Sequence, residues 1–157
     1  MAQTVTSSPI GPILLRAEAG ALTALQIGGG AEGLPMDGKD SLLAEAAAQL
    51  AAWFEGKLEQ FDLPLAPTGT PRGAEHRNAI AAIPFGDTSS YGALARSIGS
   101  SPRAIGQACR RNPFPVIIPC HRVIGTGGAI GYYSGGDGIP TKLWLLEHEQ
   151  KYLRRKG

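Results

Sequence analysis

The sequence predicts a two-domain α+β protein, and three observations support that prediction. Short β-like runs rich in Thr, Val, Ile and Leu fill most of the first 27 residues. Helical stretches with capping residues fill much of the chain after residue 73. Proline and glycine are concentrated from Pro64 to Pro71, which indicates a boundary. We therefore expect an N-terminal α+β domain at residues 1–69 and a mainly helical domain at residues 70–157.

The first domain is expected to begin with a small antiparallel sheet. Turn residues separate its strands at Gly11-Pro12 and at Glu18–Gly20. A glycine-rich loop then covers residues 28–38. The expected strands are Thr4–Ser7, Ile13–Ala17 and Leu22–Ile27.

One helix completes this domain. The apolar side chains of Ser41–Glu55 fall on a single stripe, Asp40 can cap the first turn, and Gly56 can end the helix. Residues Phe61–Leu65 form either a short strand or an extended linker.

Two short helices in the second domain form a helix-turn-helix pattern. Ser90 can cap a helix at Tyr91–Ile98, and Pro102 suits the first turn of a helix that runs to about Arg111. The turn between them, Gly99–Ser101, is short and contains glycine, as this motif requires. An ordinary helical hairpin would show the same pattern.

Other elements flank this pair. The expected ones are a helix at Ala74–Ile83, a break at Asn112–Pro115, a buried extended run at Val116–Ile118, a glycine-rich loop at Gly125–Gly138, and a last helix from a cap at Thr141 to Tyr152.

The charge is distributed unevenly along a chain whose net charge is +2. Residues 1–69 hold three Lys/Arg and eight Asp/Glu, whereas residues 70–157 hold twelve Lys/Arg and five Asp/Glu. A basic half beside an acidic half favours a polyanionic partner for the second domain. The alternative is ordinary surface variation with a basic C-terminus.

Several classes of protein are disfavoured. The chain has no run of 18 apolar residues and no secretory signal, so we expect neither a membrane span nor export. The two cysteines, Cys109 and Cys120, suit free thiols in a reducing cytoplasm. No ligand spacing for a metal is present.

The segment Pro119–Ile124 carries the chemistry. A thiol is a good nucleophile only as its thiolate, so it needs a base and a cation nearby. Here Cys120, His121 and Arg122 are consecutive. A core cysteine beside a surface histidine is the alternative, and in an extended segment His121 would reach Cys120 only through a bend or a water.

The longer string Pro-Cys-His-Arg-Val resembles the active-site signature of the O6-alkylguanine-DNA alkyltransferases. Flanking segments extend the resemblance over residues 79–150, and more loosely to residues 1–69. The matching segments are Ile83–Gly86, Ser90-Tyr91, Arg103–Gly106, Asn112-Pro113 with Pro115, Tyr133–Gly136 and Trp144–Glu149.

The resemblance implies a set of catalytic residues. Cys120 would accept the alkyl group, and His121 would act as its base through a water. A glutamate would orient His121, and Glu149 is preferred to Glu147 because it shares a helix face with Leu145. Asn112 would act as a backbone clamp, because asparagine side chains readily bond neighbouring backbone in turns. Cys109 is expected to be a small buried residue.

The resemblance also implies how DNA is bound, because O6 of guanine is reached only after the nucleotide is flipped out of the stack. Arg103 would fill the vacated stack, Ala104 and Gly106 would face the minor groove, and Arg110 and Arg111 would bind phosphates. The flipped base would meet Tyr91, Val123, Tyr133 and Ser134. Ordinary alternatives are a solvated charge for Arg103 and core packing for the tyrosines.

Three features depart from the family. The family's aromatic anchors after Thr-Pro are replaced by charged and polar groups in Arg72–Arg77. We expect this replacement to loosen or repolarise the contact below the active site. The alternative is that these residues bind a phosphate, a partner or an altered substrate. The Gly99–Arg103 turn is about two residues shorter than usual, and the Gly136–Pro140 loop is extended.

We thus expect a suicide DNA repair methyltransferase that moves an alkyl group from O6-alkylguanine in double-stranded DNA to Cys120, without a cofactor or a metal. We expect a cytoplasmic monomer, associated with the nucleoid when bound to DNA. One rival is a paralogue that binds or senses alkylated DNA without transfer, although such relatives replace the cysteine. Another is an unrelated cysteine hydrolase.

Overall fold

The computed structural model describes residues 1–28, 40–133 and 135–156. Its backbone contacts divide the chain into two compact units, Met1–Ala66 and Pro67–Gly157. Most of the glycine-rich loop expected at residues 28–38 lies outside the described residues, and so does Ser134. Of the helices described, none is both long enough and apolar enough to cross a bilayer.

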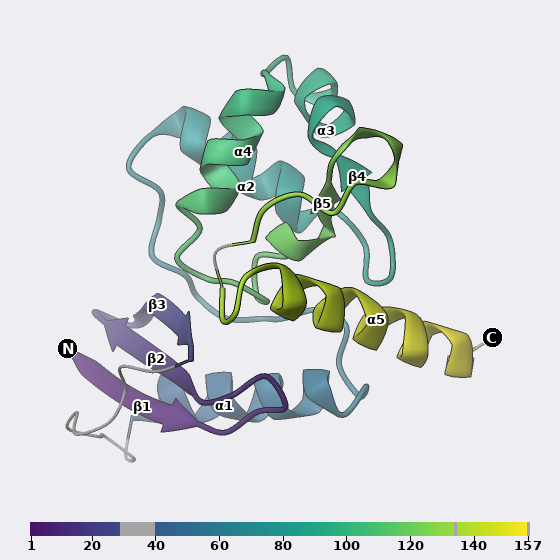
Figure 1. The fold of residues 1–157 in the computed structure, drawn as a ribbon. Coiled ribbons are helices and arrows are strands. Elements are labelled where there is room, and N and C mark those ends of the chain that lie inside the picture. Colours follow the sequence, from purple (N-terminus) through teal and green to yellow (C-terminus); the bar gives the residue numbers. More distant parts are fainter. Residues whose placement is uncertain (29–39, 134, 157) are drawn as a thin grey trace. The chain divides into compact units, whose positions relative to one another are not determined.

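The N-terminal unit is a three-stranded antiparallel sheet with one helix (Figure 1). Its strand order is β1-β2-β3, so each strand pairs with its neighbour in sequence. The register of the second pair shifts between Arg16 and Ala17, where a bulge accommodates the turn that follows. The elements are β1 (Ala2–Thr6), β2 (Ile13–Glu18), β3 (Ala21–Ile27) and α1 (Ser41–Phe54).

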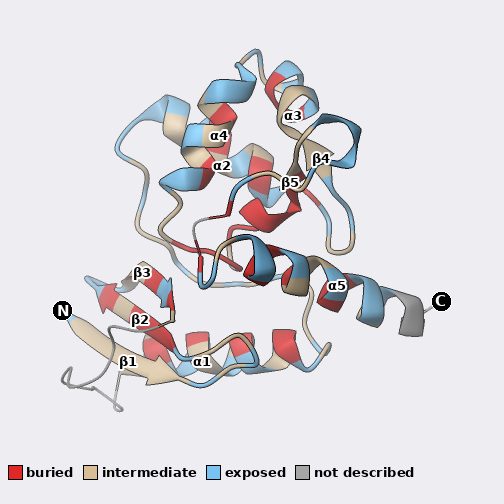
Figure 2. Ribbon diagram, in the orientation of Figure 1, coloured by how far each residue is buried: buried red, intermediate tan, exposed pale blue. Residues whose placement is uncertain are grey.

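Helix α1 begins and packs as its sequence predicts. The Asp40 carboxylate accepts a hydrogen bond from the Leu43 backbone N–H at 2.9 Å, which satisfies an otherwise unpaired donor of the first turn. Its inward stripe, including Leu43, Leu50 and Trp53, is buried (Figure 2). Residues 61–65 form no strand and contribute only an isolated bridge between Leu22 and Leu65, so the linker alternative holds.

The C-terminal unit is mainly helical. Its helices α2, α3 and α4 all begin at a hydroxyl side chain, because Thr70, Ser90 and Ser101 each accept a hydrogen bond from a first-turn N–H. The elements are α2 (Pro71–Ala81), β4 (Ser89–Ser90), α3 (Tyr91–Ser97), α4 (Pro102–Arg110), the 3₁₀ turn η1 (Cys120–Arg122), β5 (Val123–Ile124), the 3₁₀ turn η2 (Thr126–Gly128) and α5 (Ile139–Lys156).

Helices α3 and α4 form the expected helix-turn-helix pair. The chain reverses at Gly99, whose φ of +64° a side chain would disfavour. The Ser100 N–H donates to the Ala95 carbonyl at 2.8 Å. The Arg72 guanidinium also donates to the carbonyls of Ile98, at 3.2 Å, and Gly99, at 2.7 Å. Arg72, near the start of α2, therefore supports the turn between α3 and α4.

Two local expectations were wrong. Residues 116–118 are buried or partly buried, but they form a turn rather than an extended run. The Ile118 N–H donates to the Phe114 carbonyl at 2.8 Å, and Val116 adopts a φ of +75°. The last helix begins at Ile139, and the Thr141 hydroxyl accepts from the Asp137 N–H instead of starting the helix.

Candidate active site and DNA-binding helix

Cys120 lies at the start of the 3₁₀ turn η1, directly after Pro119. Only 2% of the residue is exposed, so its sulfur is shielded from bulk water. The turn supplies the bend that an extended segment would lack, and it places His121 and Arg122 in the interior of the same unit. The three consecutive residues thus form one buried cluster.

Asn112 holds the backbone that leads into this cysteine. Its amide nitrogen donates to the Ile118 carbonyl at 3.0 Å and to the Cys120 Sγ at 3.2 Å. Its amide oxygen accepts from the Phe114 N–H at 2.9 Å. The predicted backbone clamp is present, and the same side chain contacts the sulfur directly.

His121 and Glu149 form a buried pair. The His121 ring is fully buried, and its Nε2 lies 2.9 Å from Oε2 of Glu149, which is 1% exposed. The Gly86 N–H also donates to this carboxylate, at 3.2 Å. Glu147, by contrast, is exposed. Helical spacing therefore identified which of the two glutamates faces the interior.

Arg122 neutralises the glutamate and does not contact the sulfur. Its Nε and Nη2 donate to the Glu149 carboxylate at 3.0 and 2.6 Å, and its Nη1 donates to the Ile83 carbonyl at 2.6 Å. The sequence had offered the arginine as a thiolate partner. The structure corrects this, because the guanidinium fork is engaged by the carboxylate.

The pKa values in this cluster follow from burial and from these contacts. Burial raises the pKa of the Cys120 thiol, although the Asn112 hydrogen bond and the Lys142 charge oppose it. Burial lowers the pKa of His121 despite the glutamate beside it. Burial alone would raise the pKa of Glu149, but His121 and Arg122 hold it at about 2. At neutral pH the resting site thus holds a thiol, a neutral imidazole and a carboxylate.

Lys142 is a functional candidate that the sequence reading missed. It is fully buried, and its Nζ donates to the Val123 carbonyl at 2.6 Å and to the Tyr132 carbonyl at 3.2 Å. Its charge acts on the Cys120 thiol. The signal was present, because Lys142, Leu145 and Glu149 follow the three- and four-residue spacing of one helix face.

Two tyrosines border the sulfur. Tyr91 directly follows β4, which pairs in parallel with β5, so that Ser90 lies opposite Ile124. Tyr133 is 3% exposed, and its hydroxyl has no hydrogen-bond partner among the described residues. Burial raises the pKa of both tyrosines, followed by the charges of Cys109 and Cys120 for Tyr91 and by the charge of Cys120 for Tyr133. Val123 is buried, and Ser134 lies outside the described residues.

Gly131 lets the loop approach Tyr91 closely. Its φ is +76°, and a Cβ there would lie 3.0 Å from the Tyr91 hydroxyl oxygen. A larger residue would therefore displace either the loop or the tyrosine.

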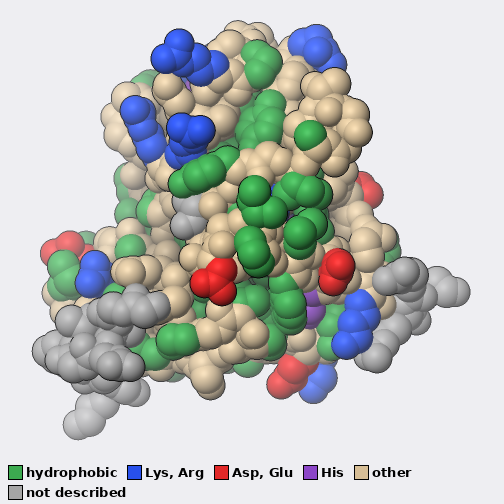
Figure 3. All heavy atoms as spheres, in the orientation of Figure 1, with side chains coloured by type: hydrophobic (Ala, Val, Ile, Leu, Met, Phe, Trp, Pro, Cys, Tyr) green, Lys and Arg blue, Asp and Glu red, His purple; other side chains and the backbone are tan. Residues whose placement is uncertain are grey.

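Helix α4 presents the residues that were predicted to bind DNA. Ile105 and Cys109 bury its inner face, and burial raises the pKa of Cys109 to about 12. Arg103 and Arg110 are exposed on the flank that includes Gly106, whose nearest neighbour is Tyr91. Ala104 and Arg111 lie on the opposite flank. Figure 3 shows Lys and Arg side chains on the surface of this unit.

No metal site accompanies this cluster. Within the described ranges, no group of three His, Cys, Asp or Glu side chains is placed to hold a metal ion. The chemistry available to the cluster is nucleophilic attack by sulfur, assisted by a neighbouring imidazole.

Two family models match the chain. The model described as 6-O-methylguanine DNA methyltransferase, DNA binding domain, matches residues 75–151. The model described as 6-O-methylguanine DNA methyltransferase, ribonuclease-like domain, matches residues 1–67.

Similar proteins carry two kinds of name. A methylated-DNA–protein-cysteine methyltransferase of Methanosarcina barkeri is 44% identical over 156 residues, covering 96% of this chain and 98% of that protein. A DNA base-flipping protein of Thermus thermophilus is 38% identical, covering 90% and 95%. The crystal structure of Mycobacterium tuberculosis OGT in complex with DNA aligns with a TM-score of 0.83 and 36% identity, covering 97% and 94%. This likeness confirms the predicted α+β fold class.

Proposed function

The chain belongs to the 6-O-methylguanine DNA methyltransferase family, and on this premise we propose that it repairs DNA by moving an alkyl group from O6 of guanine to Cys120. The observation that carries the proposal is the buried chain of contacts from Asn112 and Cys120 to His121, Glu149 and Arg122. It brings together a nucleophile, Cys120, a base, His121, and a carboxylate, Glu149, whose charge Arg122 balances.

The transfer is a displacement at the alkyl carbon. A C–S bond forms as the bond between that carbon and O6 breaks, and the electron pair of the broken bond stays on the guanine. The thiol proton passes towards His121, whose Nε2 is held by Glu149, so Nδ1 is the ring atom that takes it through a water. The guanine regains one proton, so protons balance overall. The thioether is not displaced by water, and each molecule therefore reacts once.

The leaving guanine needs hydrogen-bond donors, because charge develops on it as the C–O6 bond breaks. The Tyr133 hydroxyl is buried and has no partner among the described residues, so a bound base would supply one. We infer that Tyr91, Val123 and Ser134 complete the base pocket. The charge of Lys142 opposes the rise in the pKa of the Cys120 thiol, although burial lowers the pKa of Lys142 itself.

Base flipping is the task of helix α4. We propose that Arg103 enters the stack that the guanine leaves, while Ala104 and Gly106 face the minor groove. Arg110 and Arg111 would contact phosphates, which adds affinity without reading sequence. The exposed positions of Arg103, Arg110 and Arg111 support these roles.

A second candidate function is DNA base flipping without transfer, and the Thermus thermophilus relative with that name favours it. The two functions differ in what happens to the sulfur. Cys120 is present here in contact with Asn112, which supports transfer.

Intact-mass spectrometry separates these functions. After incubation with a duplex that contains O6-methylguanine, the protein should gain one methyl group, about 14 Da, and then stop reacting. A flipping protein would bind the duplex without a change in mass. A cysteine hydrolase would instead turn over many equivalents of an acyl substrate and show no lasting methylation.

We further propose that residues 70–157 form the DNA-binding and alkyl-accepting domain, with residues 1–69 as a separate α+β domain. A cytoplasmic location, on the nucleoid when DNA is bound, suits a protein whose two cysteines are free thiols. A monomer suffices for this scheme, because all the residues named come from one chain.

A further inference from the structure

An arginine of helix α4 and a tyrosine of the loop before α5 are in contact on the surface of the C-terminal unit. The Arg110 guanidinium lies 4.8 Å from the centre of the Tyr132 ring, within the range of a cation–π contact. Arg110 is exposed, and Tyr132 is 50% exposed although it is a large aromatic residue. We call these two residues the Arg110–Tyr132 pair. The pair joins the proposed DNA-binding helix to the loop that carries Tyr133.

The backbone of Tyr132 is tied to the proposed base pocket. Its carbonyl accepts a hydrogen bond from Nζ of Lys142 at 3.2 Å, and its backbone also forms a hydrogen bond with the Tyr91 side chain. The next residue is Tyr133, whose buried hydroxyl has no hydrogen-bond partner among the described residues. Tyr132 therefore combines a side chain at the surface with a backbone that sets the position of Tyr133.

The aromatic contact holds Arg110 in a form that suits an anion. Arg110 makes no ion pair with another described residue, so no carboxylate there competes for its charge. The N–H donors of a guanidinium lie in one plane and match the oxygens of a phosphate. A long side chain that is already held by a ring also loses less entropy when it binds. The pair is therefore a prepared phosphate contact.

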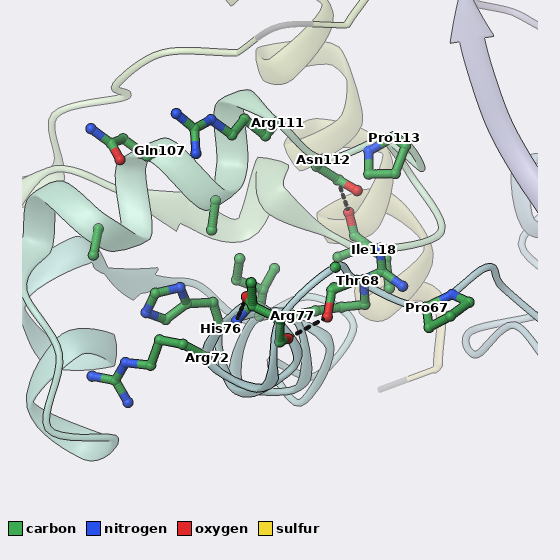
Figure 4. Close-up of a pocket in the computed structure, with 16 residues that line it drawn as sticks. Pro67, Thr68, Arg72, His76, Arg77, Gln107, Arg111, Asn112, Pro113 and Ile118 are labelled. Atoms are coloured by element: carbon green, nitrogen blue, oxygen red, sulfur yellow. Dashed lines mark hydrogen bonds between the residues drawn. The ribbon is translucent and has the colours of Figure 1, made fainter.

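The position of the pair on α4 indicates where that phosphate lies. A helix with side chains is about 10–12 Å wide, whereas the minor groove is about 6 Å wide, so a helix in the groove has a sugar–phosphate strand along each flank. Gly106 and Arg110 are four residues apart and share one flank, and a Cβ at Gly106 would lie 4.0 Å from Tyr91. Figure 4 shows Gln107 and Arg111 on the other flank, across from α2.

The flank that holds Arg110 is thus the one nearer the proposed base pocket, because Tyr91 borders both. A nucleotide that flips into this pocket comes from the strand beside it. The strand along the Gly106 flank is therefore the strand that carries the lesion, and its phosphates pass the Arg110–Tyr132 pair.

We propose that the Arg110–Tyr132 pair binds a phosphate of the lesion-bearing strand and, through the Tyr132 backbone, positions Tyr133 against the flipped guanine. The inference rests on the proposed function, because it assumes that α4 enters the minor groove and that the guanine is flipped. Tyr132 is a positioning residue, since it acts through Tyr133 and does not touch the reacting atoms. The bound phosphate then speeds the transfer itself, in addition to strengthening binding.

The test compares single-turnover transfer from a duplex that contains O6-methylguanine with transfer from the free base O6-methylguanine. Only the duplex brings a phosphate. Tyr132→Ala should lower the maximal rate with the duplex roughly tenfold, because Tyr133 is no longer held against the base. Its rate with the free base should equal that of the wild type. Tyr132→Phe keeps the ring beside Arg110 and should restore the rate with the duplex.

Arg110→Gln tests the other member of the pair. It should slow transfer from saturating duplex as Tyr132→Ala does, and it should lower the slope of log affinity against log salt by about 0.9, the value for one phosphate. The double variant should be no slower than the slower single variant, because the two residues act together. Lys151→Gln is the matched control. Its Nζ lies 5.5 Å from the Tyr152 ring centre on α5, so it removes the cation of a similar pair and should leave both rates unchanged.

Three results would overturn the proposal. Tyr132→Ala could slow transfer from the duplex and from the free base alike, which would mean general damage to the loop. It could slow neither, or the losses of the two single variants could multiply in the double variant, which would mean that the residues act independently. Each result leaves the proposed function intact when the wild type gains a methyl group from the duplex. A wild type that gains none from either substrate overturns the proposed function itself.

Discussion

The cluster around Cys120 and the helix α4 belong to the same unit. The cluster buries its charged side chains, whereas α4 exposes its arginines. In the cluster, Glu149, His121 and Arg122 are buried and satisfy one another at hydrogen-bond distance. On α4, Arg103 and Arg110 are exposed, and the Arg110 guanidinium lies 4.8 Å from the centre of the Tyr132 ring. Buried charges are costly to leave unpaired, whereas exposed charges cost little. Substitutions in the cluster should therefore affect folding and chemistry together, while those of the exposed arginines on α4 should affect DNA binding and leave stability unchanged.

The largest effect is expected for Glu149→Ala. It leaves the Arg122 guanidinium buried without its carboxylate, which should lower the free energy of unfolding by about 3–5 kcal/mol. Methyl transfer should fall as well, because His121 loses its partner. Urea denaturation and single-turnover transfer measure the two losses.

Glu147→Ala is the matched control for this substitution. It removes the same side chain from the exposed face of α5, so stability should change by less than about 0.5 kcal/mol. Equal losses in the two variants would show that the interior network is not what stabilises the fold.

Acid should destabilise the cluster next most strongly. The pKa of Glu149 is about 2 in the folded protein and near its ordinary 4.5 when unfolded. A depressed carboxylate pKa contributes stability above the unfolded value, and this stability is lost as the pH falls from about 4.5 to 2. The loss amounts to about 3 kcal/mol. Denaturation at several pH values should show it in the wild type and in Glu147→Gln.

Glu149→Gln should lack that transition, since the amide does not titrate. The variant will be less stable at neutral pH but should lose less further stability below pH 4.5. If the free energy of unfolding of Glu149→Gln fell with pH as steeply as that of the wild type, other carboxylates would be the cause of the acid sensitivity.

On α4, the strongest effect is expected for Arg103→Ala. Losing a charged hydrogen-bonding group from the vacated stack should slow transfer from a duplex roughly ten- to hundredfold. Transfer from single-stranded DNA should change little, because no partner base is left behind. Stability should be unaffected, since Arg103 is exposed.

Arg96→Ala, on the exposed face of α3, serves as the control for the lost charge. It should slow transfer from duplex DNA and from single-stranded DNA equally, or slow neither. A similar duplex-specific defect in Arg96→Ala would remove the special role of Arg103.

The smallest effect is expected at Gly106. A Cβ there would meet only Tyr91, at 4.0 Å, so Gly106→Ala should stabilise the helix by about 0.5–1 kcal/mol. Gly106→Leu should fold but bind duplex more weakly, because its side chain would fill the minor groove. Thermal melts and anisotropy measure both, and unchanged affinity in the leucine variant would place α4 outside the groove.

The sequence predicted the elements whose signals are local. Caps at Asp40 and Ser90 and the apolar stripe of α1 depend on residues within one or two turns, and the structure has all of them. Helix periodicity, together with the family motif, distinguished Glu149 from Glu147. The same periodicity places Lys142 on the inward face of α5, with Leu145 and Glu149.

Contacts between distant residues were beyond the sequence. Arg122 is 27 residues from Glu149 and 39 from Ile83, and nothing in its neighbours indicates that it turns away from the thiol. The positive φ of Val116 likewise depends on burial of the turn around it, which overrides the extended preference of a β-branched residue. Arg77 gave no local sign that it lies over Phe114.

Two cysteines in one unit allow the central claim to be tested directly. Both are buried thiols, but the Asn112 side chain donates to the sulfur of Cys120, and His121 directly follows Cys120, whereas Asn112 meets Cys109 through the backbone carbonyl of that residue. The measurement is peptide mapping after reaction with a duplex carrying isotopically labelled O6-methylguanine. We predict one label per molecule, on the peptide with Cys120, and none on Cys109. Label on Cys109, label on neither cysteine, or continued release of methyl groups to water would contradict the account.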